Sequence, residues 1–561
     1  MLLLLATTLR HDGRALGEPD VDPRMRDGRI QGMERSGMAP ARSAAGPGGV
    51  PRWLGALLGL VVAGVALAAG QVVAAFVAQD SSPIVAVARA AIDSAPAWLK
   101  SFAIETFGEQ DKVALIVGMV VVIGAIAAVV GIASLRRPAV GVGFLVALGA
   151  VGGAAALTRP NATATWALPS VVAVGAGIWA FRWLLRARGP ASPAPAVPSS
   201  APPYAFDRRT FVRGAVTLGG VAVAGGLAGA ALSERRFAAV SSRAAVRIPT
   251  AADPAPPLPA GVELGLDDLT PFVTPNRDFY RVDTALFPPQ VRSDTWSLRI
   301  HGMVDRPREI GYEELLAMDL VEHDVTLSCV SNEVGGPYAG NARWTGALLG
   351  PLLEKAGVHD GADQLVSRSA DGMTIGTPTA AVMDGREAML AVAMNGEPLP
   401  IEHGFPVRMI VPGLYGYVSA TKWIVDLAAT TFQAFDAYWV ERGWTEDPGP
   451  AKTMSRIDTP RPRADVAAGQ VAVAGVAWAQ HRGIERVEVR VDDGDWQIAE
   501  LADVPNVDTW RQWVWRWEAI PGTHTLEVRA TDGDGVTQPE ERTPPFPDGA
   551  TGWHAVVVDV G

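Results

Sequence analysis

The sequence is poor in cysteine: Cys329 is the only one among 561 residues. A single thiol makes neither an intrachain disulfide nor a cysteine-rich zinc site, and it excludes an iron–sulfur cluster held by cysteines of this chain. No CxxCH haem-attachment motif is present either. Three explanations of the thiol stay open on the residues alone: a buried apolar filler, a nucleophile, or one metal ligand.

Charge is also scarce. Charged residues make up 19% of the chain, against 48% hydrophobic residues, and the formal net charge is −11. No basic domain stands out from this acidic average, which argues against nucleic acid as a partner. The composition suggests a soluble part joined to a membrane part, and the length predicts several folded units rather than one core.

Charged residues are missing from four successive apolar stretches except at their ends. These stretches are 53–78, 113–135, 139–157 and 166–185. Each is near the roughly 20 residues that a helix needs to cross a bilayer, so residues 53–188 are predicted to form a four-helix transmembrane region. A fifth transmembrane helix is expected at 214–232. None of the eight histidines lies in any of these spans, so no membrane haem is expected.

The segments around these helices are rich in small residues, proline and arginine. Residues 1–52 are predicted to be disordered, and residues 189–213 to form a linker. The linker ends in DRRTFVR, which is similar to a twin-arginine export signal; a basic helix flank is the alternative. Placing the arginine-rich segments in the cytoplasm predicts a multi-pass protein of the cell membrane whose C-terminal half is extracytoplasmic.

The residues around Cys329 predict where its sulfur lies. Residues 325–327 alternate as in a strand, and residues 331–336 form a polar, glycine-containing turn. Cys329 is therefore expected where a strand gives way to a loop. Such a position fixes the sulfur and leaves room beside it for a bound metal.

Three segments around and after this cysteine carry a family resemblance. TLSCVSN, ARWTG and MNGEPLPIEHGFPVRMIVPGLYGYVSATKW resemble the molybdenum-binding domain of the sulfite oxidase superfamily, in the same order. The resemblance implies that residues 250–452 form an α+β molybdopterin-binding oxidoreductase domain. It also implies that Cys329 binds molybdenum beside a pyranopterin; no haem is expected in this chain.

The resemblance further implies a set of cofactor contacts. By matching motifs these are Asn276, Tyr280, Arg281, Cys329, His403, Arg408, Ser419, Thr421 and Lys422. An arginine fork suits phosphate or pterin edges, and hydroxyls with a lysine suit a phosphate. Without the resemblance, Asn276, Tyr280 and Arg281 would be explained as part of a turn followed by an aromatic strand. Ser419, Thr421 and Lys422 would be explained as part of a solvated loop.

Departures from the family's pattern bear on the substrate. Val282 and Thr284 stand where sulfite oxidases place arginine and histidine, and Glu333 and Val334 stand where they carry an arginine. The missing cations disfavour an anionic substrate such as sulfite. Trp444, at the position of an active-site tyrosine, and Arg343 are predicted to act with Cys329 in the catalytic pocket; structural packing is the equal alternative for each.

Several local elements are expected from pattern alone. Residues 296–302 should form a strand, 312–318 a short helix, and 344–356 a helix that ends at Gly357. Residues 453–561 are predicted to form an Ig-like β-sandwich, similar to the family's dimerisation domain, which implies a homodimer. Its expected strands are 470–478, 484–491, 510–517, 525–530 and 554–559, with a hairpin turn at 492–495. Alternation places Trp513, Trp515 and Trp517 on one face, as core packing or, less commonly, an interface.

The sequence thus predicts a membrane-anchored enzyme that moves an oxygen atom between a small-molecule substrate and water. Electrons would pass singly to a separate protein or a quinone. A sulfoxide reductase of the same superfamily is the closest alternative, and a cofactor-free cell-surface binding or assembly module is the second. A cysteine hydrolase would need a histidine base, for which His301, His323 and His403 are available.

Overall fold

The computed structural model describes residues 51–95, 111–159, 162–186, 208–237, 239–285 and 287–561. Nearly all of the N-terminal segment predicted to be disordered, and residues 189–207 of the predicted linker, lie outside this part of the chain.

Five described helices are long and apolar enough to cross a membrane, judged by length and composition. They are α2 (Arg52–Val77), α5 (Asp111–Ser134), α6 (Pro138–Leu157), α7 (Leu168–Arg186) and α8 (Arg208–Phe237). All five stretches predicted as transmembrane helices are helical; that they cross a membrane stays a prediction. Residues 208–213, predicted as linker, instead form the first turns of α8, where Phe211 is fully buried.

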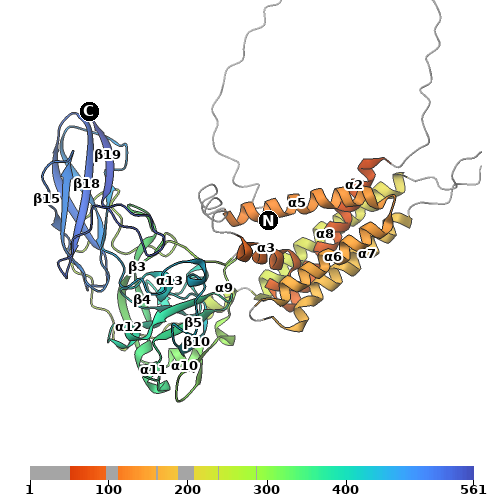
Figure 1. Ribbon diagram of the computed structural model, residues 1–561, viewed down its shortest axis with the longest axis horizontal. Helices are drawn as coiled ribbons and strands as arrows, with labels where there is room; N and C mark the ends of the chain where they lie inside the picture. The colour runs from red at the N-terminus through yellow and green to blue at the C-terminus, as the bar shows by residue number, and fades with distance from the viewer. Residues whose placement is uncertain (1–50, 96–110, 160–161, 187–207, 238, 286) are drawn as a thin grey trace, which may run out of the picture. The chain divides into compact units, whose positions relative to one another are not determined.

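Helix α2 packs against α5, α7 and α8 (Figure 1). Small residues allow this: a Cβ atom added to Gly59 would overlap the backbone of Ala127 in α5, and one added to Gly131 would overlap the backbone of Gly55. Close backbone approach at glycine is typical of helix pairs in apolar surroundings. A shorter apolar helix that the sequence pattern did not predict, α3 (Pro83–Ser94), starts with proline at its first position.

Residues 297–430 contain two sheets, one mixed and one antiparallel. In the first sheet the strand order is β2-β1-β10-β5-β6, with β1 and β10 parallel. Its strands are β1 (Ser297–Gly302), β2 (Arg308–Gly311), β5 (Gln364–Ser369), β6 (Thr374–Pro378) and β10 (Ile424–Thr430). The predicted strand at 296–302 is confirmed.

The second sheet has the order β3-β4-β7-β8, and β9 pairs with β7. Its strands are β3 (Leu320–Ser328), β4 (Ala339–Leu348), β7 (Met389–Met394), β8 (Glu397–Pro398) and β9 (Arg408–Ile410). Short helices connect the two sheets: α10 (Tyr312–Leu316), α11 (Leu349–Ala356), α12 (Thr379–Met383) and α13 (Gly416–Ser419). Another short helix, α9 (Ala239–Ala245), precedes both sheets.

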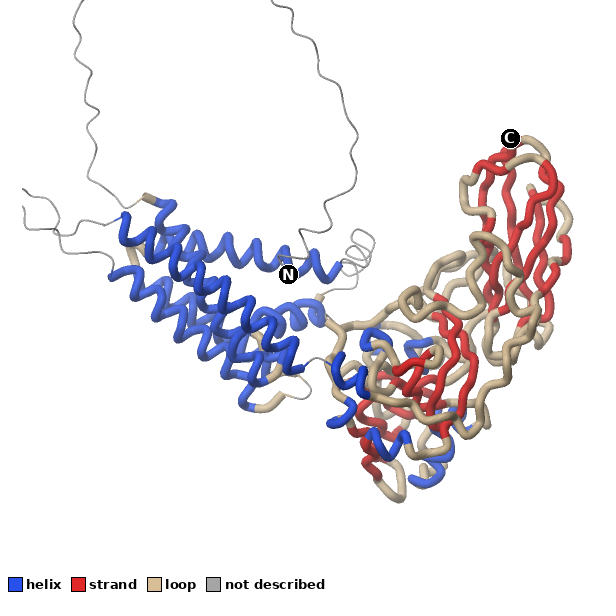
Figure 2. Tube along the Cα trace, turned by 180° about the vertical axis from the view of Figure 1, so that it is seen from behind, coloured by secondary structure: helices blue, strands red, loops and turns tan. Residues whose placement is uncertain are grey.

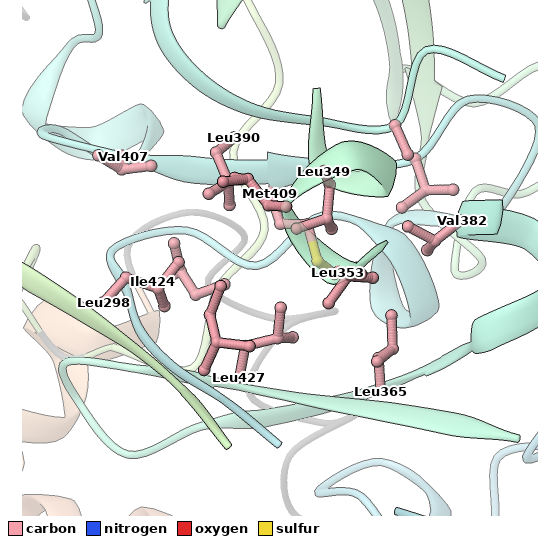
Figure 3. Packing of buried hydrophobic residues seen from close by; sticks show 14 of the residues in the cluster. Leu298, Leu349, Leu353, Leu365, Val382, Leu390, Val407, Met409, Ile424 and Leu427 are labelled. Carbon is pink, nitrogen blue, oxygen red and sulfur yellow. The ribbon is translucent and has the colours of Figure 1, made fainter. Parts of the chain in front are cut away.

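Aliphatic side chains from both sheets and α11 form one core. Figure 3 shows Leu298, Leu365 and Leu427 from the first sheet packing near Leu390 and Met409 from the second, with Leu349 and Leu353 of α11 beside them. All of these side chains are fully buried. This core holds β9 through Met409 and the turn after β3 through Val330, which matters for the site below.

One predicted element is wrong in part. Residues 344–348 belong to β4 rather than to a helix, because β4 lies between β3 and β7 and its side chains are buried on both faces. A strand buried on both faces loses its alternation, so its apolar spacing can imitate a helix. The helix begins at Leu349 and ends at Gly357, whose φ of 70° is the left-handed cap that was predicted.

Residues 454–560 contain two further sheets (Figure 2). The first has the order β11-β13-β17-β16 and the second β12-β19-β18-β14-β15. The strands are β11 (Met454–Thr459), β12 (Asp465–Val466), β13 (Gly469–Trp478), β14 (Ile484–Val491), β15 (Gln497–Ile498), β16 (Glu500–Leu501), β17 (Arg511–Ala519), β18 (Gly522–Asp532) and β19 (His554–Val560).

The five predicted strands of this region are confirmed within a few residues, and β11, β12, β15 and β16 were not predicted. Trp513 and Trp517 are buried in the core of this region with Trp515 packed against it, so core packing explains their alternation. Asp492 and Asp493, both with positive φ, turn the chain between β14 and β15. The Ig-like assignment itself stays a prediction.

Candidate functional site

Cys329 directly follows β3, where the strand gives way to a turn. Its backbone N–H donates a hydrogen bond to the carbonyl of Tyr338 (2.9 Å), and its own carbonyl accepts one from Asn332 (3.0 Å). The Sγ atom lies 2.9 Å from the Oγ atom of Ser331. The residue is buried, at 9% exposure. The position expected from the sequence is confirmed, and the backbone on both sides holds the sulfur in place.

The surroundings of the sulfur set its protonation. Burial raises the pKa of the Cys329 thiol, while the hydrogen bond with Ser331 and the positive charge of Lys422 act in the opposite direction. Burial is the largest of these effects, so the protein alone favours the neutral thiol. A bound metal ion would deprotonate it, because a coordinating thiol is a thiolate.

Asn276, Tyr280 and Arg281, three of the predicted cofactor contacts, lie in residues 274–281, here called the opening loop. The Tyr280 ring lies 6.4 Å from that of Tyr338, whose carbonyl accepts the Cys329 N–H. Burial raises the pKa of the Tyr280 phenol, and the negative charge of a Cys329 thiolate raises that pKa further, whereas Arg408 lowers it. Its ring stacks on Phe279 at 5.3 Å between centroids. The phenol is therefore a neutral donor held in the same buried region as Cys329 and Arg408.

Arg408 opens β9 and is buried at 5% exposure. Its Nη1 donates to the carbonyl of His403 (3.2 Å), and its guanidinium lies 5.0 Å from the ring centre of Trp344. Among the described residues its Nε has no hydrogen-bond partner. Burial lowers the pKa of Arg408 to about 10, so the group is still a cation at neutral pH. A buried cation with an unused donor is costly unless a polar ligand completes it.

Lys422 adds a second buried cation. Its Nζ donates to Asp283 Oδ2 (2.8 Å) and to the carbonyl of Glu402 (3.3 Å), and it lies 4.8 Å from the ring centre of Trp423. Burial lowers the pKa of Lys422 to about 8, although Asp283 opposes the shift. Arg281 binds the same carboxylate at 2.8 Å and is more exposed, with 36% of its side chain accessible.

His403 braces the opening loop. Its Nε2 lies 3.0 Å from the carbonyl oxygen of Asn276, and since a carbonyl only accepts, Nε2 carries the proton. Burial and the charges of Arg408 and Lys422 lower the pKa of His403 to about 3, so the ring is neutral. The Asn276 side chain is itself fixed, accepting a hydrogen bond from Asn395 Nδ2 (2.8 Å).

The predicted phosphate hydroxyls are engaged within the protein. Ser419 Oγ donates to the carbonyls of Leu414 and Tyr415, at 3.2 and 2.9 Å. Thr421 Oγ1 lies 2.5 Å from Ser367 Oγ. Both residues are buried. These hydroxyls close the chain around α13 and hold Lys422 in position; a direct contact of either with a phosphate stays a prediction.

The two predicted pocket residues lie in other surroundings. Arg343 forms a two-point ion pair with Asp324 on the neighbouring strand, at 3.0 and 2.8 Å, and also donates to the carbonyl of Pro256. Trp444 packs in an aromatic cluster with ring centroids 5.9 Å from Tyr417 and 5.4 Å from Phe546. The contacts of these two residues thus differ from those that join Cys329 to Tyr280, Arg408 and Lys422.

Two further residues of the site did not emerge from the sequence. Ser331 contacts the sulfur, and Asp283 joins Arg281 to Lys422. Ser331 stands two residues after Cys329, where a short polar side chain in a turn regularly forms hydrogen bonds with its neighbours. This local signal could have identified Ser331 from the sequence. Asp283 gave no local signal, because its partner Lys422 is 139 residues away in the sequence.

The residues present fit a molybdopterin. Cys329 offers a fixed sulfur, which suits a soft metal ion. Arg408 offers a buried donor without a partner among the described residues, and Lys422 a buried cation; both suit the anionic, polar head of a cofactor. The donor set is too small for a metal held by protein side chains alone, and a ligand that brings its own sulfur atoms would complete it.

Comparisons with known proteins agree with this chemistry. Residues 285–439 match the family described as "Oxidoreductase molybdopterin binding domain". The chain is 30% identical over 324 residues to human mitochondrial sulfite oxidase, covering 49% of this chain and 58% of that protein. It is also 30% identical over 324 residues to chicken sulfite oxidase, of which it covers 69%.

A solved structure, the sulfane dehydrogenase SoxCD from Paracoccus pantotrophus, is 23% identical and covers 52% of this chain and 84% of that chain, with a TM-score of 0.46. Among the sulfite oxidases, the chain spans less than two thirds of the human protein's length but more than two thirds of the chicken protein's length. Taken with the cysteine and the buried cations, these matches show that the chain belongs to the molybdopterin-dependent oxidoreductases of the sulfite oxidase superfamily.

Proposed function

We propose that this protein is a membrane-anchored oxidoreductase that uses a molybdenum cofactor for oxygen-atom transfer at an extracytoplasmic site. The observation that carries the proposal is the grouping of Cys329, Tyr280 and the two buried cations Arg408 and Lys422 in one region of the molybdopterin-binding domain. A structural role alone gives no reason to keep two cations buried beside a buried thiol, because both cations cost desolvation energy.

Each residue has a proposed part in holding the cofactor. Cys329 would supply the thiolate ligand, Arg408 Nε would donate to the pterin, and Lys422 would attract the phosphate. His403 would keep the opening loop in place through Asn276, with Tyr280 and Arg281 beside the cofactor. When bound, the cofactor supplies oxygen-atom transfer and takes up two electrons, and the protein supplies binding and orientation.

The substrate pocket is proposed to suit a small neutral molecule rather than sulfite. Val282 and Thr284 supply no charge, and Arg343, the cation predicted for the substrate pocket, is paired with Asp324. The assignment of Arg343 and Trp444 to the pocket stays a prediction. A panel assay that offers sulfite, thioethers and sulfoxides separately to the purified protein, with a one-electron dye as acceptor or donor, tests both substrate and direction.

In that panel, dye reduction by a thioether supports the oxidase direction. Sulfoxide-dependent oxidation of a reduced dye would favour the reductase alternative. Turnover with sulfite at a rate above that of every neutral compound would overturn the proposed pocket. A molybdenum-loaded protein that turns over none of the compounds would remove the case for this substrate class.

The membrane part is proposed to anchor the enzyme. The five apolar helices support this by length and composition, and the arginines between them favour an extracytoplasmic C-terminal half. Export by the twin-arginine route is proposed for the same reason, with Arg208 and Arg209 at the start of α8. Residues 250–452 would then work outside the cytoplasm. Protease treatment of intact spheroplasts tests the orientation: cleavage of that region supports it, and full protection contradicts it.

The C-terminal region is proposed to be the Ig-like, dimerising part of the enzyme, and the electron acceptor to be a separate protein or a quinone. The two-sheet arrangement of residues 454–560, antiparallel except for the β12–β19 pair, supports the first proposal. Light scattering of the detergent-solubilised protein tests it: a mass of two chains is expected, and a monomer at micromolar concentration would contradict it.

A further inference from the structure

A segment of the C-terminal β-region is bound to the edge of strand β3. The carbonyl of Asp508 accepts a hydrogen bond from the N–H of Thr326 (3.0 Å), and the N–H of Trp510 donates to Thr326 Oγ1 (2.7 Å). Asn506 Nδ2 donates to the carbonyl of Asp324 (3.1 Å). Strand β3 ends its sheet, so this segment covers an edge that would otherwise be open.

Three side chains that can bind a metal ion meet at this seam. His323 lies on β3, Glu387 two residues before the start of β7, and Asp508 in the covering segment. His323 Nε2 is 2.9 Å from Asp508 Oδ2 and 3.7 Å from Glu387 Oε2. The three ligand atoms all lie within 4.8 Å of one another. One imidazole and two carboxylates converge from parts of the chain that are far apart in sequence.

The spacing suits a small divalent cation. Zinc binds histidine nitrogen and carboxylate oxygen at roughly 2.0–2.2 Å in a tetrahedral arrangement, which places ligand atoms somewhat over 3 Å apart. Small side-chain rotations bring the three atoms to that spacing, since Glu387 is exposed at 46% of its side chain. Asp508, with 3% of its side chain exposed, is the fixed member.

A second layer of contacts orients the buried ligand. The other oxygen of Asp508, Oδ1, lies 3.0 Å from His481 Nδ1, and the Asp508 N–H donates to Asn506 Oδ1 (2.8 Å). Such outer contacts are typical of metal-binding carboxylates. The neighbouring cations do not compete strongly for the site, because Arg343 is paired with Asp324 and Arg386 with Asp384.

We propose that His323, Glu387 and Asp508 bind one Zn²⁺ ion, with water as the fourth ligand, and that this ion ties the C-terminal β-region to strand β3. The site is separate from the molybdopterin site: it uses none of the residues that contact Cys329. Its effect would be on the joining of the two regions, because two of its ligands come from the molybdopterin-binding region and one from the C-terminal region.

The test uses the full chain, purified in detergent without a polyhistidine tag, stripped with a chelator and titrated with zinc chloride alone. Bound zinc is measured by mass spectrometry after desalting, and thermal unfolding is followed in parallel. Wild-type protein should bind one zinc per chain and unfold at a higher temperature with zinc. Glu387→Gln and His323→Gln should each bind zinc at least tenfold more weakly and lose the thermal shift.

His359→Gln is the matched control, because His359 also pairs with a carboxylate, Asp305 at 3.1 Å, but outside this cluster. It should bind zinc as the wild type does. Glu387→Gln keeps the test valid if His323→Gln fails to fold, since Glu387 is half exposed. Wild-type protein that binds no zinc, or Glu387→Gln protein that binds zinc with wild-type affinity and thermal shift, would overturn the proposal.

Discussion

Lys422 Nζ lies 2.8 Å from Asp283 Oδ2, and both side chains are buried. Arg281 Nε lies 2.8 Å from the same oxygen. One carboxylate thus partners two cations beside the candidate cofactor site. Without a bound anion this arrangement keeps Lys422 charged at neutral pH, because its pKa is about 8 despite its burial. Asp283 therefore stabilises the charged form of Lys422, and an anionic cofactor would share Lys422 with it.

Replacing Asp283 by asparagine is expected to destabilise the molybdopterin-binding region. Removing one partner of a buried ion pair leaves the other charge uncompensated, which costs about 3 kcal/mol. The midpoint of thermal unfolding, followed by tryptophan fluorescence, should fall by several degrees. Asp294→Asn is the matched control, because the Arg292–Asp294 pair is exposed and such pairs contribute little to stability. Equal midpoints for the two variants would show that Asp283 has no such role.

Arg408→Lys should reduce retention of the cofactor while keeping the charge. Lysine lacks the planar fork and cannot present a donor at the position of Arg408 Nε, and a lost hydrogen bond to a charged group costs roughly 1.5–3 kcal/mol. The affinity for the cofactor should fall roughly 10- to 100-fold, which is measured as a greater loss of molybdenum during dialysis than in wild type. Arg299→Lys, at an exposed position of β1, should retain wild-type molybdenum. Retention by Arg408→Lys as complete as in wild type would contradict the assignment.

Acid should destabilise the C-terminal region through His554. Burial lowers its pKa to about 4, below the ordinary 6.5, and its Nδ1 accepts a hydrogen bond from the Ile457 N–H (3.0 Å). As pH falls below 6.5 the unfolded chain takes up this proton before the folded chain does. The contribution of neutral His554 to the free energy of unfolding is therefore complete above about pH 6.5. It declines toward pH 4, by roughly 2 kcal/mol between pH 7 and pH 5.

The measurement for His554 compares thermal midpoints at pH 7 and pH 5. His554→Gln keeps an acceptor for Ile457 but cannot be protonated, so its midpoint should fall less between the two pH values than that of wild type. His359→Gln, at an exposed histidine, should fall as wild type does. If wild type and His554→Gln lose the same amount, the titration of His554 does not contribute.

The sequence predicted elements whose signals are local. Cys329 was expected at the end of a strand because alternation and a glycine turn flank it, and Gly357 was expected to cap a helix. Residues 344–348 were assigned wrongly because burial on both faces of β4 removes the alternation that identifies a strand. Sequence periodicity depends only on residues that are close along the chain. It therefore predicts secondary structure poorly where a residue is buried by other strands.

For the same reason, ion pairs between residues on different strands and loops could not be predicted from the sequence. The Asp324–Arg343 pair depends on the register of β3 against β4, in which these two residues face each other. Lys422 and Asp283 are 139 residues apart, and His323 and Asp508 are 185 apart. The family resemblance identified Lys422 and Arg408. It did not identify Asp283, which stabilises Lys422, or the Nε atom of Arg408, which has no hydrogen-bond partner among the described residues.

The most direct test of the central claim measures molybdenum and pterin in the full chain and in Cys329→Ser, both purified in detergent from cells that make the cofactor. Wild-type protein should contain close to one molybdenum per chain, with X-ray absorption at the metal showing one more sulfur neighbour than in the serine variant. A folded wild-type protein without molybdenum, or an identical sulfur environment in the two proteins, would contradict the assignment of Cys329 as the metal ligand.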